Sequence, residues 1–144
     1  MTIRILVADD HPVVRHGLRT LLNSNPKWKV VDEAEDGLEA VEKTSRLRPD
    51  LVILDVSMPK MNGLEACRRI RKSVPESEVL FVTQHDSQQM MREALAAGAR
   101  GYVVKSNAAR DLLAAVAAVS QHKSFTVLDC PNKVEKVSSP EDRR

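Results

Sequence analysis

The sequence predicts a doubly wound α/β domain, in which a parallel sheet is covered by helices on both faces. Short runs of β-branched and aliphatic residues alternate with longer segments whose apolar residues recur at helical spacing,. Five such strand–helix units follow one another, and this order implies right-handed crossovers and a parallel sheet. With 144 residues, the chain is too short for a closed eight-unit barrel, which typically needs about 250.

Local patterns place the individual elements. The run Leu51–Leu54 is fully apolar and follows Pro49 and Asp50, as expected of a central parallel strand,. Pro12 suits the first turn of a helix. The expected strands are Ile3–Ala8, Val30–Ala34, Leu51–Leu54, Val79–Thr83 and Tyr102–Val104, and the expected helices are Pro12–Leu22, Gly37–Arg46, Leu64–Lys72, Gln88–Ala97 and Ala109–Gln121.

The chain is expected to hold one domain, residues 1–121, and a C-terminal tail, residues 122–144. From Lys123 onward the sequence mixes prolines, serines and charges, and its short apolar run Thr126–Leu128 is too short to organise a fold. We therefore expect this tail to be flexible or loosely docked. It is also too short to form a second folded domain.

Composition argues against several classes of protein. The formal net charge is only +2 and aromatic residues make up 3%, so the basic patch and stacking surface of a nucleic-acid-binding protein are not expected. Cys67 and Cys130 lie far apart without metal-ligand spacing, as is typical of reduced thiols,. Neither a signal peptide nor a membrane span is evident. These features predict a cytoplasmic protein.

Polar residues stand directly at the ends of the expected strands. Asp9 and Asp10 follow the first strand, Asp55 follows the third, Thr83 ends the fourth, and Lys105 follows the fifth. In an open α/β sheet the ligand site lies beyond the carboxyl ends of the strands. If the strand order is the flavodoxin-like 2-1-3-4-5, the first and third strands are neighbours and three carboxylates meet at one point.

These residue types fit phosphoryl transfer. Clustered carboxylates repel one another, and a divalent cation with a preference for hard oxygen ligands, Mg²⁺, would offset that repulsion. Asp55 is the best nucleophile, with Thr83 and Lys105 as donors to the phosphoryl oxygens. The glycine-rich loop of nucleotide-binding proteins is missing from the first strand–helix turn. Taken singly, Asp9, Asp10 and Asp55 could equally be helix caps or turn formers.

At these residues the sequence resembles the receiver domains of two-component response regulators. The resemblance covers residues 2–121 and depends on VADDHPVVRHGL, LDVSMPKMNG, VTQHD and ARGYVVKS, which together are highly specific. The segments DDHPVVRHGL and GARGYVVK are most similar to the subgroup that usually carries a C-terminal helix-turn-helix (LuxR-type) output domain.

The resemblance implies that Asp55 is phosphorylated by a sensor histidine kinase or a phosphotransfer protein. It implies Asp9, Asp10, Asp55 and the backbone carbonyl of Ser57 as Mg²⁺ ligands, Thr83 and Lys105 as phosphoryl-binding groups, and Tyr102 as an aromatic switch. In a two-state account, the phosphoryl group draws the Thr83 hydroxyl inward, and the Tyr102 ring fills the vacated space.

Gln84 departs from the pattern of the subgroup, where a small residue or methionine is expected. Its longer amide could hinder access or orient an attacking water, which makes the lifetime of phosphorylated Asp55 a question for experiment. Among the histidines, His11, His16 and His122 are expected to be exposed or to cap helices, and His85 lies nearest the site.

Three functions follow from this reading. The first is a signalling module, not an enzyme, whose phosphorylation switches a protein-interaction surface. The second is the receiver part of a longer DNA-binding regulator whose output domain is absent from this chain. The third, a small Mg²⁺ phosphatase, is weaker because Ser57 stands where Asp-x-Asp phosphatases use a second acid. The Ala- and Val-rich helix from Ala108 also suggests a homodimer contact.

Overall fold

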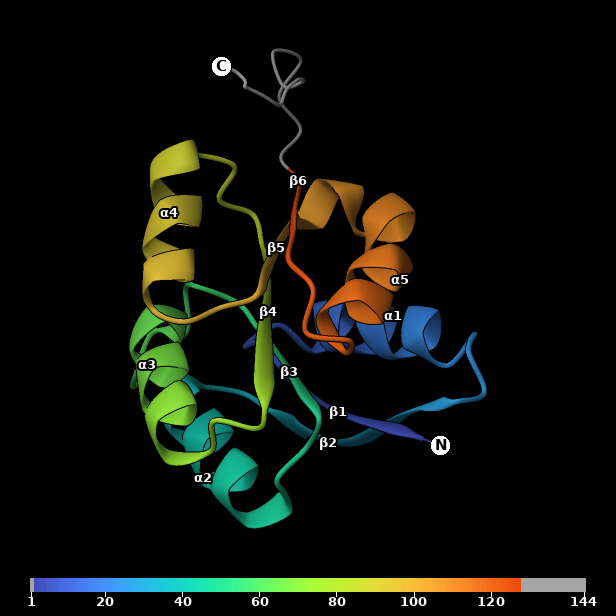
Figure 1. The fold of residues 1–144 in the computed structure, drawn as a ribbon, viewed down its shortest axis with the longest axis horizontal. Helices are drawn as coiled ribbons and strands as arrows, with labels where there is room; N and C mark the ends of the chain where they lie inside the picture. Colours follow the sequence, from blue (N-terminus) through green and yellow to red (C-terminus); the bar gives the residue numbers. More distant parts are fainter. Residues whose placement is uncertain (1, 128–144) are drawn as a thin grey trace.

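A six-stranded, wholly parallel sheet runs through the centre of the molecule in the order β2-β1-β3-β4-β5-β6 (Figure 1). The computed structural model describes residues 2–127. The strands are β1 Ile3–Ala8, β2 Trp28–Ala34, β3 Leu51–Leu54, β4 Glu78–Thr83, β5 Gly101–Val104 and β6 Phe125–Val127, and the helices are α1 Pro12–Leu22, α2 Gly37–Leu47, α3 Gly63–Ser73, α4 Gln88–Ala96 and α5 Ala108–Val119, with a 3₁₀ turn at Lys105–Asn107.

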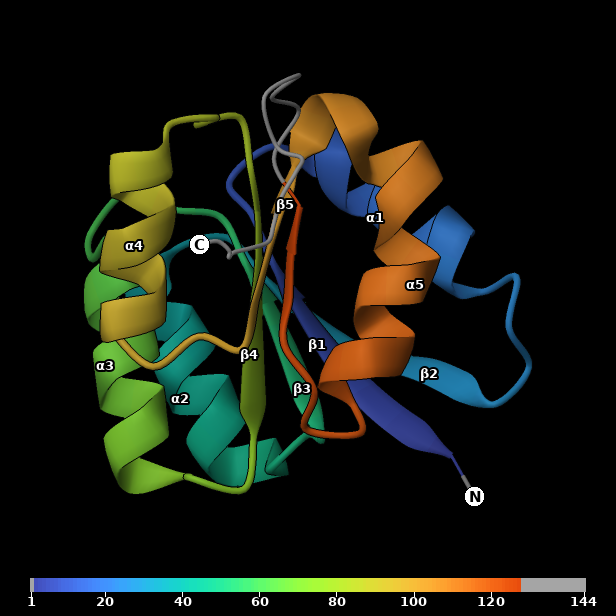
Figure 2. The same cartoon turned by 45° about the horizontal axis from the view of Figure 1, so that its top comes forward.

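Helices cover both faces of this sheet. Figure 2 shows α2, α3 and α4 on one face and α1 with α5 on the other. Each layer has its own apolar core: Leu6, Leu54 and Phe81 point toward the first group of helices, and Ile5 and Ile53 toward the second. The two cores alternate along each strand, because successive side chains point to opposite faces. The predicted doubly wound fold and its 2-1-3-4-5 order are confirmed.

Side-chain caps begin three of the helices. Asp36, Asn62 and Ser87 each accept a hydrogen bond from the backbone N–H three residues later, which satisfies a donor that the helix leaves unpaired,. Pro12 occupies the first turn of α1, as predicted. Within residues 2–127, no helix is both long enough and apolar enough to cross a membrane.

The strand β6 lies where the sequence predicted the start of a tail. Phe125 pairs with Gly101, and Val127 with Val103, parallel to β5. Without this strand, β5 would end the sheet and leave a row of backbone donors and acceptors without strand partners. The Phe125 side chain also packs against the core beneath α5. Phe125–Val127 are therefore docked on the sheet, residues 122–124 form the turn before them, and the rest of the predicted tail, with Cys130, lies outside the described residues.

A buried charge cluster lies at the opposite edge of the sheet from the strand ends that carry Asp9 and Asp55. The Glu78 side chain is only 3% exposed, forms an ion pair with Arg100 at 3.0 Å and is hydrogen-bonded to His122 Nδ1 at 2.6 Å. Burial by itself raises the pKa of this carboxyl. The hydrogen bonds from His122 and Arg100, with the charge of Arg71, outweigh burial and hold the pKa below its usual value of 4.5,.

The Glu78 cluster should make stability depend on pH. Below about pH 5 the unfolded chain takes up a proton at this carboxyl before the folded chain does, so the free energy of unfolding falls as pH drops. We expect Glu78→Gln to lose this contribution and to show a shallower fall between about pH 5 and 3 in urea unfolding. The exposed Glu42→Gln should match the parent, and a parent-like slope in Glu78→Gln would contradict the assignment.

Candidate functional site

The predicted site residues converge at the carboxyl edge of the sheet. Ala8 pairs with Leu54 across β1 and β3, so Asp9 and Asp55 leave neighbouring strands at the same level. Lys105, just beyond β5, brings its Nζ to 2.8 Å from Asp9 Oδ2 and 3.0 Å from Asp55 Oδ2. The strand order thus joins residues that are about fifty or a hundred positions apart in the sequence.

The two central carboxylates are almost fully buried. Asp9 is 1% and Asp55 3% exposed, whereas the Asp10 side chain remains 31% exposed. Lys105 holds one oxygen of Asp55, and the other, Oδ1, is buried without a hydrogen-bond partner among the described residues. A buried carboxylate oxygen without a donor is unfavourable. The geometry therefore leaves Asp55 Oδ1 available to a cation or an electrophile.

Lys105 supplies the compensating positive charge. Burial by itself lowers the pKa of its ammonium group, because the charged form loses water,. The hydrogen bonds and charges of Asp9 and Asp55 outweigh that effect and raise the pKa above its usual value. Lys105 therefore stays charged at neutral pH, between the two buried carboxylates.

His11 belongs to the rim of this pocket, and its place there was not predicted. It precedes α1 as the N-cap residue, as expected of a capping histidine, but its side chain does not cap the helix. Instead Nδ1 lies 3.1 Å from oxygens of both Asp9 and Asp10. One ligand atom from each of Asp9, Asp10, His11 and Asp55 falls within 4.8 Å of the others. The signal in the sequence was only that His11 directly follows the acidic pair.

Thr83 and Tyr102 both meet the loop after β4. Thr83 is fully buried, and its Oγ1 accepts a long hydrogen bond of 3.5 Å from the backbone N–H of His85. Tyr102 is fully buried as well, with its ring centroid 6.3 Å from that of Phe81 and its hydroxyl donating to the His85 carbonyl at 2.6 Å. Burial, with the negative charges of Asp55 and Asp86, raises the pKa of Tyr102 to about 12. The ring thus already occupies an inward position.

The mouth of the pocket is formed by two loops in contact. Ser57 is exposed on the loop after β3, and its hydroxyl lies 2.9 Å from His85 Nε2 on the loop after β4. Both residues line a hollow that also reaches Asp10. Gln84 is exposed and does not line this hollow. Its influence on the lifetime of a phosphorylated Asp55 stays a prediction, while His85 is the neighbour that actually faces the pocket.

Two glycines allow the loop after Asp55 to fold back tightly. A Cβ added at Gly63 would lie 1.9 Å from the carbonyl oxygen of Asp55, and one added at Gly37 would lie 1.9 Å from that of Met61. The Gly63 N–H also donates to the Val56 carbonyl at 2.7 Å. No other residue type has room at these positions. The backbone around Asp55 is therefore fixed from both sides.

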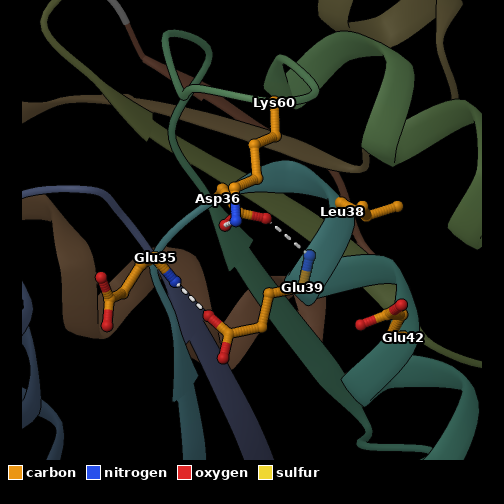
Figure 3. Close-up of a pocket in the computed structure, with 6 residues that line it drawn as sticks. All are labelled: Glu35, Asp36, Leu38, Glu39, Glu42 and Lys60. Carbon is orange, nitrogen blue, oxygen red and sulfur yellow. Dashed lines mark hydrogen bonds and ion pairs between the residues drawn. The ribbon is translucent and has the colours of Figure 1, made fainter.

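A second, acidic hollow lies beside α2 (Figure 3). Two of its carboxylates have structural partners: Asp36 accepts from the Glu39 N–H, and Glu39 accepts from the Glu35 N–H, both at 2.7 Å. Lys60 reaches from the loop after β3 to 3.6 Å from Asp36. These contacts begin α2 and hold that loop, so we assign the hollow a structural role.

Comparison with known proteins identifies the class to which this fold and site belong. The response regulator receiver domain family matches residues 5–117. The transcriptional regulatory protein DegU of Brevibacillus brevis is 38% identical over 123 residues, covering 85% of this chain and 52% of DegU. The oxygen regulatory protein NreC of Staphylococcus epidermidis is 40% identical over 124 residues, covering 85% of this chain and 57% of NreC.

A solved structure supports the same family assignment. A two-component response regulator of the LuxR family from Aurantimonas sp. SI85-9A1 superposes with a TM-score of 0.83 at 37% identity, covering 87% of this chain and 89% of that chain. The chain belongs to the response regulator receiver domain family, and the predicted LuxR-type subgroup is confirmed. It spans about half the length of the curated relatives it matches.

The glycine contacts can be tested by a matched pair of substitutions. Gly63→Ala places a methyl group against the Asp55 carbonyl, and we expect it to lower the free energy of unfolding by about 1–3 kcal/mol. Gly17→Ala adds the same methyl group to α1 in open space. This substitution should raise the free energy of unfolding by about 0.5–1 kcal/mol. Urea unfolding of both variants measures the contrast; equal effects would contradict the steric account.

Proposed function

We propose that this chain is a phosphoryl acceptor in which Asp55 receives the phosphoryl group of a sensor histidine kinase or a phosphotransfer protein. One observation carries the proposal. The Asp55 carboxylate is buried, one of its oxygens is held by Lys105, and the other has no partner among the described residues. Such an oxygen is positioned and activated without being blocked, as a nucleophile must be.

Mg²⁺ fits the same cluster. The donor atoms are mostly carboxylate oxygens, which hard divalent cations prefer, and Asp55 Oδ1 has no hydrogen-bond partner within residues 2–127,. We infer that Asp9, Asp10 and Asp55, with the backbone carbonyl of Ser57, would hold the ion. When bound, Mg²⁺ would offset negative charge on the transferred group and on the carboxylates.

The transfer needs no acid or base beyond these residues and the donor. An Asp55 carboxylate oxygen attacks phosphorus and forms a P–O bond, while the P–N bond of the donor phosphohistidine breaks and its imidazole leaves with the electron pair. The Lys105 ammonium offsets charge on the phosphoryl oxygens, and the Thr83 hydroxyl donates a hydrogen bond to one of them. In this proposal the chain itself receives the phosphoryl group and turns over no separate substrate, so it acts as a signalling module rather than an enzyme.

The switch in this proposal is a shift between two positions of Tyr102. Its ring is inside in the structure, with the hydroxyl on the His85 carbonyl. A phosphoryl group that draws Thr83 away from the His85 N–H would favour that inward state over an outward one. Phosphorylation then stabilises a position that the unphosphorylated chain already samples.

The output is proposed to be contact with proteins in the cytoplasm. The outer side of α5 exposes Leu113, Ala114 and Ala117, a surface suited to a partner or to a second copy of the chain. The alternative is that this receiver controls a DNA-binding part of a longer regulator. That reading is favoured by the match to about half the length of a transcriptional regulatory protein. A phosphatase is disfavoured, because Ser57 in place of an acid contacts His85.

Phosphorylation can be tested with a small donor. Incubation with acetyl phosphate and Mg²⁺ should add one phosphoryl group to the parent, measured by intact mass, and none to Asp55→Asn. Asp86→Asn changes an exposed carboxylate near the pocket mouth and should be labelled like the parent. The proposal would be overturned if Asp55→Asn were labelled, or if neither the parent nor Asp86→Asn were labelled.

The ion site has a separate thermodynamic test. A ligand that binds only the folded chain stabilises it by about 2.7 kcal/mol at a hundred times its Kd, so Mg²⁺ should raise the melting temperature of the parent. Asp10→Asn removes one repelling carboxylate, and we expect a higher melting temperature without Mg²⁺ and little further rise with it. A parent-like response to Mg²⁺ in Asp10→Asn would exclude Asp10 as a ligand.

A further inference from the structure

The strand β6 is joined to the segment of β5 that leads into the site. Its residues pair with Gly101, Tyr102 and Val103, and Figure 2 shows it running beside β5 between α4 and α5. Because the pairing is parallel, the carboxyl end of β6 lies at the same edge as the acidic pocket. Lys105, the partner of Asp55, follows Val103 by only two residues. The pocket and β6 are therefore connected through one short stretch of backbone, from β5 to Lys105.

Contacts in addition to the three-residue strand pairing hold β6 against β5. A Cβ added at Gly101 would lie 2.8 Å from Leu80 Cδ1, 2.9 Å from Val119 Cγ2 and 3.0 Å from the Phe125 carbonyl oxygen, so β6 packs closely against β5 at this glycine. The Phe125 N–H donates to the Arg100 carbonyl at 3.2 Å. The Phe125 side chain adds apolar burial against the core under α5.

The turn before β6 is anchored as well. His122 has a left-handed backbone conformation, with φ of 64°, and its N–H donates to the Val119 carbonyl at the end of α5. Its ring contacts the buried carboxylate of Glu78 at 2.6 Å, which Arg100 also holds. The chain reversal between α5 and β6 is thus tied to the start of β4.

Three side chains form a row across the outer strands. Phe81 of β4 pairs with Tyr102 of β5, and Tyr102 pairs with Thr126 of β6. Paired residues of neighbouring strands point to the same face of a sheet. The Tyr102 ring lies on the Phe81 side of this row, buried and hydrogen-bonded to the loop after β4. A ring that swung away from Phe81 would move over Thr126.

We propose that β6 is a conformational sensor of the site: its docking on β5 favours the inward Tyr102 ring, and phosphorylation of Asp55 in turn strengthens its docking. The inference rests on the proposed function, because it requires a phosphoryl group that favours the inward ring. It adds a named segment of this chain, Phe125–Val127, as the element that responds. An outward ring would crowd Thr126 and weaken the pairing of β6.

The coupling has to be reciprocal. If a phosphoryl group on Asp55 strengthens β6 docking, then docked β6 must strengthen phosphoryl binding by the same factor. Loss of β6 should therefore weaken the binding of an aspartyl-phosphate mimic, although β6 does not touch Asp55. Couplings of this kind are typically about fivefold or more in affinity.

Beryllofluoride with Mg²⁺, a mimic of the aspartyl phosphate, provides the probe. Hydrogen exchange of the parent should show slower exchange of the β6 amides in the presence of the probe than in its absence. Tyr102→Ala removes the ring that connects the two sites, and its β6 exchange should not respond. Phe125→Pro removes the N–H that pairs with Arg100, and should bind beryllofluoride about fivefold more weakly, whereas Lys123→Ala, exposed and outside the strand, should bind it like the parent.

The outcomes separate the two proposals. Beryllofluoride that binds the parent and leaves β6 exchange unchanged overturns the sensor and keeps the proposed function. A β6 response in Tyr102→Ala equal to that of the parent also overturns the sensor. A parent that binds beryllofluoride no better than Asp55→Asn overturns the proposed function and the sensor with it. The parent measurement decides the question even if Phe125→Pro fails to fold.

Discussion

The whole carboxyl edge of this molecule depends on one interaction, the ammonium of Lys105 between the buried carboxylates of Asp9 and Asp55. Two acids with almost no exposure to water repel each other, and the desolvation of each is unfavourable. Lys105 contacts both, but its single positive charge offsets only one of the two negative charges, and Asp55 Oδ1 is left without a partner among the described residues. The cluster therefore keeps net negative charge, and Asp55 Oδ1 is the nucleophile oxygen through which the proposed reaction would occur.

The scaffold around this interaction restricts how the site can move. Gly63 allows the chain after Asp55 to pass against its own carbonyl, and Gly37 allows α2 to approach the same loop. On the other side, Tyr102 and Ser57 both contact His85. The loop after Asp55 is held by the glycine contacts, whereas the loop after β4 is held by hydrogen bonds. We therefore expect the loop after β4 and strand β5 to be the parts that move when the site changes. The sixth strand extends that responsive region to the residues after α5.

The sequence predicts the fold and the convergence of most candidate site residues for a specific physical reason. Parallel strands all end at one edge, so the residues after each strand, such as Asp9, Asp55 and Lys105, must converge once the order is known. The contacts that it missed have no local pattern. Three residues, Phe125–Val127, carry no periodicity, and their docking depends on pairing with a strand that begins at the distant Gly101. The inward place of Tyr102 depends on a backbone carbonyl seventeen residues away.

A structure of the complex with Mg²⁺ and beryllofluoride tests the central claim most directly. The account predicts beryllium bonded to a carboxylate oxygen of Asp55, with the Lys105 ammonium and the Thr83 hydroxyl both within hydrogen-bonding distance of fluorine. In that complex the Lys105 ammonium contacts the added group as well as the two carboxylates. An adduct on another residue, or one on Asp55 that leaves Lys105 and Thr83 in their present contacts, would contradict the account.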